Sequence, residues 1–292
     1  MECYTNCFSQ EGYIDRDGVE LYFIKTESKY GCNCVNNKPV IVFIHGNDMN
    51  SSIWKCQQNY FCKNYKILAI DLRGFGKSSK PPGSLTAEVH AADLKFVLDT
   101  LEITKIYLVG WSIGGIVSLS FTLSYPEYVK KLVLIDTTPQ ILASENFPFG
   151  RSLIEQAEIL SVIEFDFPTY ANDGAVNSVP ERCPGAKLVQ NRLRRIILSN
   201  NKNIVLRQTI DIAIFSAVDR LSTITIPTLI VFGGEDKIIN PGASIFMRLN
   251  IPNSHIVEFP EAGHNPFLTY YIKFNKYLQN FFENKNKCQI CK

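Results

Sequence analysis

The stretch VGWSIGG, residues 109–115, decides the fold of this 292-residue chain. It follows the strand-like run KIYL and precedes the helix-like run IVSLSFTLSY. A serine in so tight a turn between a strand and a helix has a positive φ, and side chains two residues before and after it would clash. Gly110 and Gly114 occupy those two positions. The pattern therefore predicts that the Ser112 hydroxyl is presented at the carboxyl end of a parallel strand, where α/β proteins bind ligands.

Short apolar runs rich in Val and Ile recur on both sides of this stretch, separated by longer segments of helical period. This alternation predicts an α/β fold with a mostly parallel sheet covered by helices. The first two runs lie close together, so we expect the sheet to open with antiparallel strands. The runs are 19–26, 40–45, 66–71, 105–110, 131–136, 228–234 and 255–260, and residues 84–102 have the period of an amphipathic helix.

The alternation stops after Asp136. About 90 residues pass before the next strand-like run, too many for an ordinary connection. Residues 139–220 contain the helical runs SLIEQAEIL, LVQNRLRRIILS and IVLRQTIDIAIF, interrupted by FPFG, DFPTY and VPERCPG. We interpret this segment as a helical lid inserted into a core made of residues 1–138 and 221–292. The alternative is a few extra helices at one edge of the sheet.

Composition excludes several classes of partner. Thirty basic and 28 acidic side chains give a net charge of +2, so no strong field favours nucleic acid or an acidic membrane. No apolar run approaches the roughly 20 residues that span a bilayer. The first residues, MECYTNCFSQEGY, lack the pattern of a secretory signal.

The nine cysteines form an odd number, consistent with reduced thiols and a cytoplasmic location rather than a disulfide framework. Two spacings could suit half of a zinc site. We interpret them as adventitious thiols and expect no metal. They are Cys32-x-Cys34 and Cys288-x-x-Cys291, with Cys3 and Cys7 near the other terminus.

A serine nucleophile needs a base, and four histidines are available. His90 is expected on the surface of the helix at 84–102, and His255 at the amino end of a strand. His45 could reach the carboxyl edge but precedes Ser112 in the chain. His264 follows the run HIVEFP on a loop at that edge, so we predict that it is the base.

The base needs an acid that orients its ring. Asp236 follows the run TLIVFGG at the carboxyl edge, and two glycines before it allow the loop to turn inward. Asp136, at the end of another run, is the rival candidate. We predict Asp236 as the acid and expect the Glu235 side chain to point away.

The amide of Ile113 should donate to a developing oxyanion, with the Asn47 amide of the loop His45-Gly46-Asn47-Asp48 as the second donor. Aromatic residues in and near the proposed lid suggest an apolar pocket wall, although they could equally form the lid's own core. The expected pocket residues are Trp111, Phe147, Phe149 and Phe167.

Taken together, these motifs resemble the α/β-hydrolase superfamily over residues 40–282. They are HGND at 45–48, DLRGFGKS at 71–78, GWSIGG at 110–115, GGED at 233–236 and AGHNP at 262–266. The resemblance implies a roughly eight-stranded sheet with a lid, and Ser112, Asp236 and His264 as nucleophile, acid and base. GWSxGG is similar to pimeloyl-carrier methyl ester esterases, and IDTTPQ to haloperoxidase-like esterases.

The resemblance predicts a serine hydrolase, without cofactor, that cleaves a small or medium carboxylic ester, thioester or lactone as a monomer or homodimer. Two alternatives remain open. The same three residues could serve carbon–carbon bond hydrolysis or acyl transfer, or the chain could be a slow-turnover ligand receptor.

Overall fold

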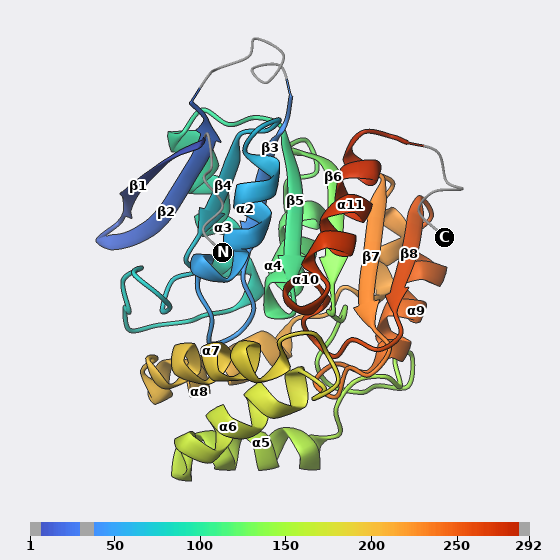
Figure 1. Ribbon diagram of the computed structural model, residues 1–292. Coiled ribbons are helices and arrows are strands. Elements are labelled where there is room, and N and C mark those ends of the chain that lie inside the picture. The colour runs from blue at the N-terminus through green and yellow to red at the C-terminus, as the bar shows by residue number, and fades with distance from the viewer. Residues whose placement is uncertain (1–6, 30–37, 286–292) are drawn as a thin grey trace.

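Eight strands form one sheet, in the order β1-β2-β4-β3-β5-β6-β7-β8, in the computed structural model, which describes residues 7–29 and 38–285 (Figure 1). The pairs β1–β2 and β2–β4 are antiparallel, and every other pair is parallel. The predicted α/β fold is therefore confirmed. The sheet does open with antiparallel strands, but the first two predicted runs are not neighbours, because β2 pairs with β1 and β4 while β3 is parallel to both of its neighbours. The strands are β1 Cys7–Arg16, β2 Val19–Ser28, β3 Val40–Ile44, β4 Ile67–Ile70, β5 Ile106–Trp111, β6 Val129–Ile135, β7 Thr228–Gly233 and β8 Ser254–Phe259.

Helices cover both faces of the sheet (Figure 1). One face packs against α3 (Ala87–Thr100), α4 (Ile113–Ser124) and α9 (Pro241–Asn250), and the other against α2 (Lys55–Phe61) and α11 (Tyr271–Phe282). The short helix α10 (Pro266–Thr269) precedes α11, and the 3-10 turns are η1 Ser51–Trp54, η2 Ile212–Ile214 and η3 Val218–Thr223.

Successive side chains of a strand enter opposite cores because they point to opposite faces of the sheet. In β3, Val42 and Ile44 join the core under α3 and α4, whereas Ile41 and Phe43 join the core under α2 and α11. Each fully buried side chain of this kind contributes about 1.5–3 kcal/mol. The two cores hold the central strands in place, and with them the loops at their carboxyl ends.

Four helices lie between β6 and β7 in the chain and sit beyond the carboxyl ends of the strands (Figure 1). We call residues 139–220, which contain them, the insert. α6 was not expected, because its FPT sequence suggested an interruption. In the structure Asp166 caps this helix by accepting a hydrogen bond from the Thr169 amide, and Pro168 occupies the first turn, where proline is tolerated. The four helices are α5 Leu153–Phe165, α6 Phe167–Ser178, α7 Ala186–Leu198 and α8 Lys202–Asp211.

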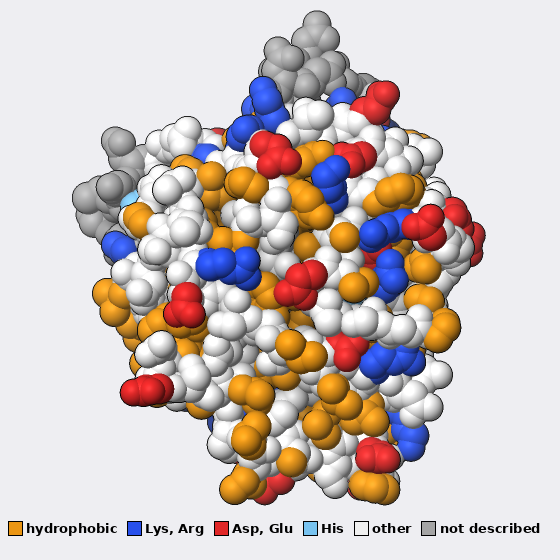
Figure 2. All heavy atoms as spheres, turned by 180° about the vertical axis from the view of Figure 1, so that it is seen from behind, with side chains coloured by type: hydrophobic (Ala, Val, Ile, Leu, Met, Phe, Trp, Pro, Cys, Tyr) orange, Lys and Arg blue, Asp and Glu red, His pale blue; other side chains and the backbone are white. Residues whose placement is uncertain are grey.

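Acidic and basic side chains are interspersed on the face shown in Figure 2, as the net charge of +2 suggests. Large exposed apolar side chains occur on and beside the insert helices, among them Leu153, Ile154, Phe165 and Ile214. No helix within residues 7–29 and 38–285 combines the length and apolar character needed to cross a bilayer.

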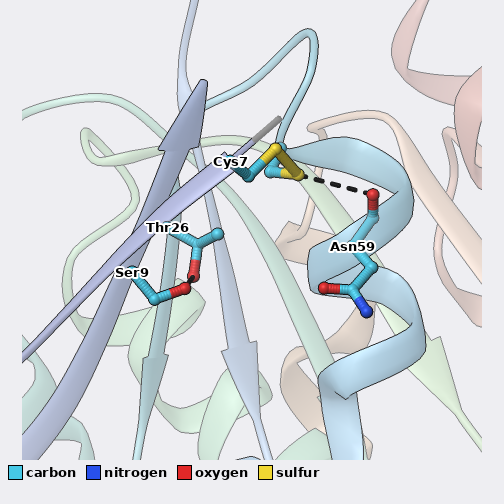
Figure 3. The surroundings of a disulfide bond; sticks show 5 residues. Cys7, Ser9, Thr26 and Asn59 are labelled. Carbon is cyan, nitrogen blue, oxygen red and sulfur yellow. Dashed lines mark hydrogen bonds between the residues drawn. A yellow bond between two sulfur atoms is a disulfide. The ribbon is translucent and has the colours of Figure 1, made fainter. Parts of the chain in front are cut away.

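The edge strand β1 was also missed by the sequence analysis, because most of its side chains are exposed and it has no apolar run. It is joined to α2 by a disulfide between Cys7 and Cys62, with Cα atoms 6.1 Å apart (Figure 3). The expectation of reduced thiols is therefore wrong for this pair, and Cys7 is not available to a metal. Cys56 and Cys183 are not in disulfides, and the other five cysteines lie outside the described residues.

We predict that Cys62→Ser lowers the free energy of unfolding by about 2–4 kcal/mol, because the disulfide closes a separation of 55 residues and so restricts the unfolded chain. Chemical denaturation measures the change. Cys56→Ser, on the same helix, is the matched control, and dithiothreitol should lower the stability of wild type but not of Cys62→Ser. Equal stability of wild type with and without reductant would contradict the prediction.

Candidate active site

Ser112 stands at the start of α4 with φ 55° and ψ −124°, the positive φ that the glycine spacing predicts. A Cβ atom on Gly110 would overlap the carbonyl oxygen of Gly114, and one on Gly114 would overlap the carbonyl oxygens of Ile44 and His45. Both glycines are therefore required by close backbone contacts. They let β5, α4 and the end of β3 meet at one point.

His264 and Asp236 form a buried pair. His264 Nδ1 lies 2.8 Å from Asp236 Oδ2, and Asp236 Oδ1 accepts hydrogen bonds from the amides of Ile238 at 2.8 Å and Ile239 at 3.1 Å. Since the carboxylate accepts, Nδ1 carries the proton and Nε2 is left as a base. The acid is thus held on both oxygens, which fixes the plane of the imidazole ring.

Ser112, Asp236 and His264 line one cavity of about 730 Å³. No hydrogen bond joins Ser112 Oγ to the His264 ring within the described part of the chain. Catalytic hydrogen bonds are often long in proteins without substrate and shorten when substrate binds. The structure therefore brings the three predicted side chains to one cavity without closing the serine–histidine contact.

Asp136, the rival acid, lies behind this pair. Its Oδ1 accepts a hydrogen bond from the Gly233 amide at 2.8 Å, and burial, together with the nearby Asp236 carboxylate, raises its pKa well above the usual range. Asp136, Asp236 and His264 offer ligand atoms within 4.8 Å of one another. Hydrogen bonds already occupy both Asp236 oxygens and one Asp136 oxygen, so we interpret the cluster as a hydrogen-bonded Asp236–His264 pair with a second buried carboxyl behind it. Glu235 points away, as expected, and pairs with Arg182.

The other histidines have structural surroundings. His45 is fully buried, donates from Nδ1 to the Gly46 carbonyl at 2.7 Å and accepts the Leu72 amide at Nε2 at 2.9 Å. His90, expected on the surface, is fully buried beside Gln208 Oε1 at 2.8 Å, and burial lowers its pKa to about 4. That expectation was wrong because the insert covers this side of α3. His255 lies in the second position of β8.

The loop after β3 lies directly against the nucleophile. A Cβ atom on Gly46 would stand 2.9 Å from the Trp111 ring and 3.1 Å from Ser112 Cβ. The backbone N–H groups of Asn47 and Ile113 donate to no backbone carbonyl among residues 7–29 and 38–285. Two unused donors therefore flank Ser112, as an oxyanion hole requires.

The next residue of this loop, Asp48, was not singled out from the sequence. It has φ 57° and is buried, and its Oδ2 accepts a hydrogen bond from the Tyr170 hydroxyl of α6 at 2.8 Å. Burial raises the Asp48 pKa to about 7. Non-glycine residues with positive φ after a strand mark strained loops, and Asp48, Ser112 and Asp136 all share this conformation.

Trp111 connects the serine turn to the histidine loop. Its indole N–H donates to the carbonyl oxygen of His264 at 2.7 Å, and its ring lies 5.3 Å from the imidazole. The α6 end of the insert holds the same loop, because the His264 amide donates to the Ser178 carbonyl at 2.9 Å. The His264 loop is therefore positioned from both the core and the insert.

Both the core and the insert contribute to the cavity wall. Trp111 and Phe149 line it as expected, but Phe147 and Phe167 do not belong to the lining. Phe147 is fully buried and packs against Phe149 and Phe246, and Phe167 stacks on Tyr170. The expectation of an apolar wall is only partly correct, because polar and charged side chains also line the cavity. Among them are Asp48, Arg151, Glu155, Glu158, Tyr170, Asp173, Asn177, Thr209 and Lys237.

The sequence of this chain is similar to those of known proteins. The sequence model of the alpha/beta hydrolase fold family matches residues 39–270. Pimeloyl-[acyl-carrier protein] methyl ester esterase from Wigglesworthia glossinidia brevipalpis is 26% identical, over 84% of this chain and 94% of the relative. The AB hydrolase superfamily protein YisY of Bacillus subtilis is 24% identical, over 89% of this chain and 98% of the relative.

Solved structures agree with the sequence relatives. The esterase EaEST from Exiguobacterium antarcticum superposes with a TM-score of 0.84 at 24% identity, covering 91% of this chain and 97% of its own. A thermophilic esterase from Thermogutta terrifontis, with malate bound, has a TM-score of 0.80 at 26% identity and covers 94% and 98%. The fold seen in Figure 1 is therefore the fold of these proteins.

We predict that Trp111→Phe destabilises the protein by about 1–3 kcal/mol more than Trp54→Phe, because it leaves the His264 carbonyl without its donor. Trp54 is the matched control. It is fully buried and stacks on Phe267, but its indole N–H has no hydrogen-bond partner among the described residues. Chemical denaturation of both variants measures the difference, and equal losses would show that the Trp111 hydrogen bond does not hold the loop.

Proposed function

Because this chain belongs to the α/β-hydrolase fold family, we propose that it is a serine hydrolase that cleaves a carboxylic ester, thioester or lactone through an acyl-enzyme. The observation that carries the proposal is the shared cavity, where the strained Ser112 turn meets the buried His264–Asp236 pair. The esterases among the relatives support ester hydrolysis in general.

In the first half of the reaction, His264 Nε2 takes the proton of the Ser112 hydroxyl as its oxygen attacks the substrate carbonyl carbon. The carbonyl π electrons move to oxygen, and the amides of Asn47 and Ile113 donate to the resulting oxyanion. One such donor is worth about 10²–10³-fold in rate. Collapse of the intermediate expels the alcohol or thiol, which takes the proton from His264, and leaves the acyl group on Ser112.

In the second half, His264 takes a proton from water, and the hydroxide oxygen attacks the acyl carbon. Collapse breaks the bond to Ser112, which regains its proton from His264, and the carboxylic acid leaves. Asp236 accepts the hydrogen bond from His264 Nδ1–H throughout and stabilises the imidazolium that forms twice per turnover.

The proposal includes the insert as a lid over Ser112, with the core made of residues 1–138 and 221–292. Its support is that α5 and α6 supply cavity lining, among it Ile159 and Tyr170. A cavity of about 730 Å³ falls within the range of small-molecule sites, so the proposed substrate is a small acyl compound. A monomeric or homodimeric state stays a prediction.

A cytoplasmic location also stays a prediction. The Cys7–Cys62 disulfide counts against it, because disulfides are rare in reducing compartments. The prediction can be tested by measuring whether Cys7 and Cys62 are oxidised in the protein isolated from its native cell. A reduced pair would support a cytoplasmic location.

We predict that Ser112→Ala lowers kcat/KM for p-nitrophenyl acetate by at least about 10³-fold, since the nucleophile is lost. A fluorophosphonate probe should label wild type on Ser112 and leave Ser112→Ala unlabelled. Ser124→Ala, an exposed serine at the other end of α4, is the matched control and should match wild type in both assays. Undiminished hydrolysis by purified Ser112→Ala would overturn the proposal, and labelling without turnover would favour a slow receptor.

A further inference from the structure

Arg151 places a cation in the wall of the cavity that contains Ser112 and His264. Its side chain is half-buried. The guanidinium makes one hydrogen bond, from Nη1 to Gln156 Oε1 at 3.2 Å, and pairs with no carboxylate within 4.0 Å in the described ranges. Burial lowers the pKa of Arg151, but arginine stays charged in proteins. Burying a charge is costly unless the charge is paired and hydrogen-bonded, and most of the five N–H donors of this guanidinium are unused. A bound anion would supply the missing acceptors.

The backbone fixes Arg151 in this place. Its amide donates to the Ile141 carbonyl at 2.8 Å, and its carbonyl accepts the Ala143 amide at 2.8 Å. A Cβ atom on Gly150 would overlap the backbone of Leu142 and Ala143, so the glycine lets the two segments pair. The segment 141–143 follows β6 closely, and Arg151 is thereby anchored to the first part of the insert, next to the carboxyl edge of the sheet, rather than to its helices.

The carboxylates near the cavity act on this cation only over distances longer than an ion pair, because none of those in the described ranges lies within 4.0 Å of the guanidinium. Asp48 accepts from Tyr170 and Asp236 from His264, and Glu155 accepts from Ser152 in the cap of α5. Glu155, Glu158 and Asp173 are exposed at the solvent side of the lining. Salt screens such exposed charges over about 10 Å, whereas a ligand inside the cavity meets the guanidinium directly.

We infer that Arg151 is a substrate-binding residue and that the ester carries a second, free carboxylate, which the guanidinium binds while Ser112 attacks the ester carbonyl. The chemistry fits, because guanidinium and carboxylate form paired hydrogen bonds in one plane. This inference rests on the proposed function and adds the substrate class to it. The carboxylate can belong to the acyl part or to the alcohol part of the ester.

Two matched pairs of stable esters separate these sources. Monomethyl glutarate carries the charge on the acyl part, and its neutral isostere is methyl glutaramate. Acetoxyacetate carries the charge on the alcohol part, and its neutral isostere is acetoxyacetamide. We predict that wild type prefers the anion of at least one pair by about 10- to 100-fold in kcat/KM, mainly through KM. The pair that shows the preference identifies the source.

Arg151→Gln should reduce the ratio of kcat/KM for the anion to kcat/KM for its neutral isostere to about one or below. Arg151→Lys should give an intermediate ratio, because lysine keeps the charge but lacks the paired N–H donors of the guanidinium. Arg194→Gln, an exposed arginine of α7, is the matched control and should keep the wild-type preference. Circular dichroism and fluorophosphonate labelling verify that each variant is folded with a competent serine. The inference is overturned if wild type prefers neither anion, or if Arg151→Gln keeps the preference.

A binding measurement keeps this result distinct from the proposed function. Glutarate should raise the melting temperature of Ser112→Ala protein more than glutaramide does, and the added Arg151→Gln change should abolish the difference. If no ester is hydrolysed and no serine is labelled, the serine hydrolase proposal fails, while a glutarate shift that depends on Arg151 still supports the anion site. If esters are hydrolysed but wild type prefers neither anionic ester and glutarate gives no such shift, the anion site fails alone.

Discussion

The rest of the site depends on one tight backbone contact, in which β5, α4 and the end of β3 meet around Ser112. Gly110 and Gly114 leave no room for a side chain, since each would place a Cβ atom on a neighbouring carbonyl oxygen. This contact forces the positive φ of Ser112 and directs the first amides of α4 toward the cavity. The parallel order of β3, β5, β6, β7 and β8 then brings the other loops to the same edge.

The insert also helps to position the proposed catalytic groups. Residues of α6 hold two different loops of the core, because Ser178 accepts from the His264 amide and Tyr170 donates to Asp48 beside the oxyanion amide. A shift of this helix would therefore move the His264 loop and the loop after β3 together. In the proposed mechanism, α6 connects the cavity wall to both of these loops.

Much of this was predictable from local sequence. The serine turn depends on residues within five positions of one another, and Asp236 and His264 each follow a strong strand, so periodicity and glycine spacing predict that all three lie at one edge of the sheet. The hydrophobic period of a segment does not predict burial that is caused by residues far away in the sequence, nor does it reveal a strand whose side chains are mostly exposed. β1 is an exposed edge strand without an apolar run, and His90 is buried only because Gln208 of the insert packs over it.

The pocket illustrates the same limit at the level of single side chains. Phe147 and Phe149 are two residues apart, yet the first is enclosed by Phe149 and Phe246 while the second faces the cavity. No pattern in FPFG distinguishes them, because Phe246 comes from α9.

Arg151, directly after this motif, gives no signal in the sequence, since a single arginine beside a helix cap is most often a solvated side chain. Its importance follows from two things that only the fold supplies, the backbone pairing with residues 141–143 and the absence of a carboxylate partner within the described chain. The proposed catalytic groups therefore follow from the motif that builds the edge. The proposed substrate preference instead depends on a charge that the insert leaves unpaired beside that edge.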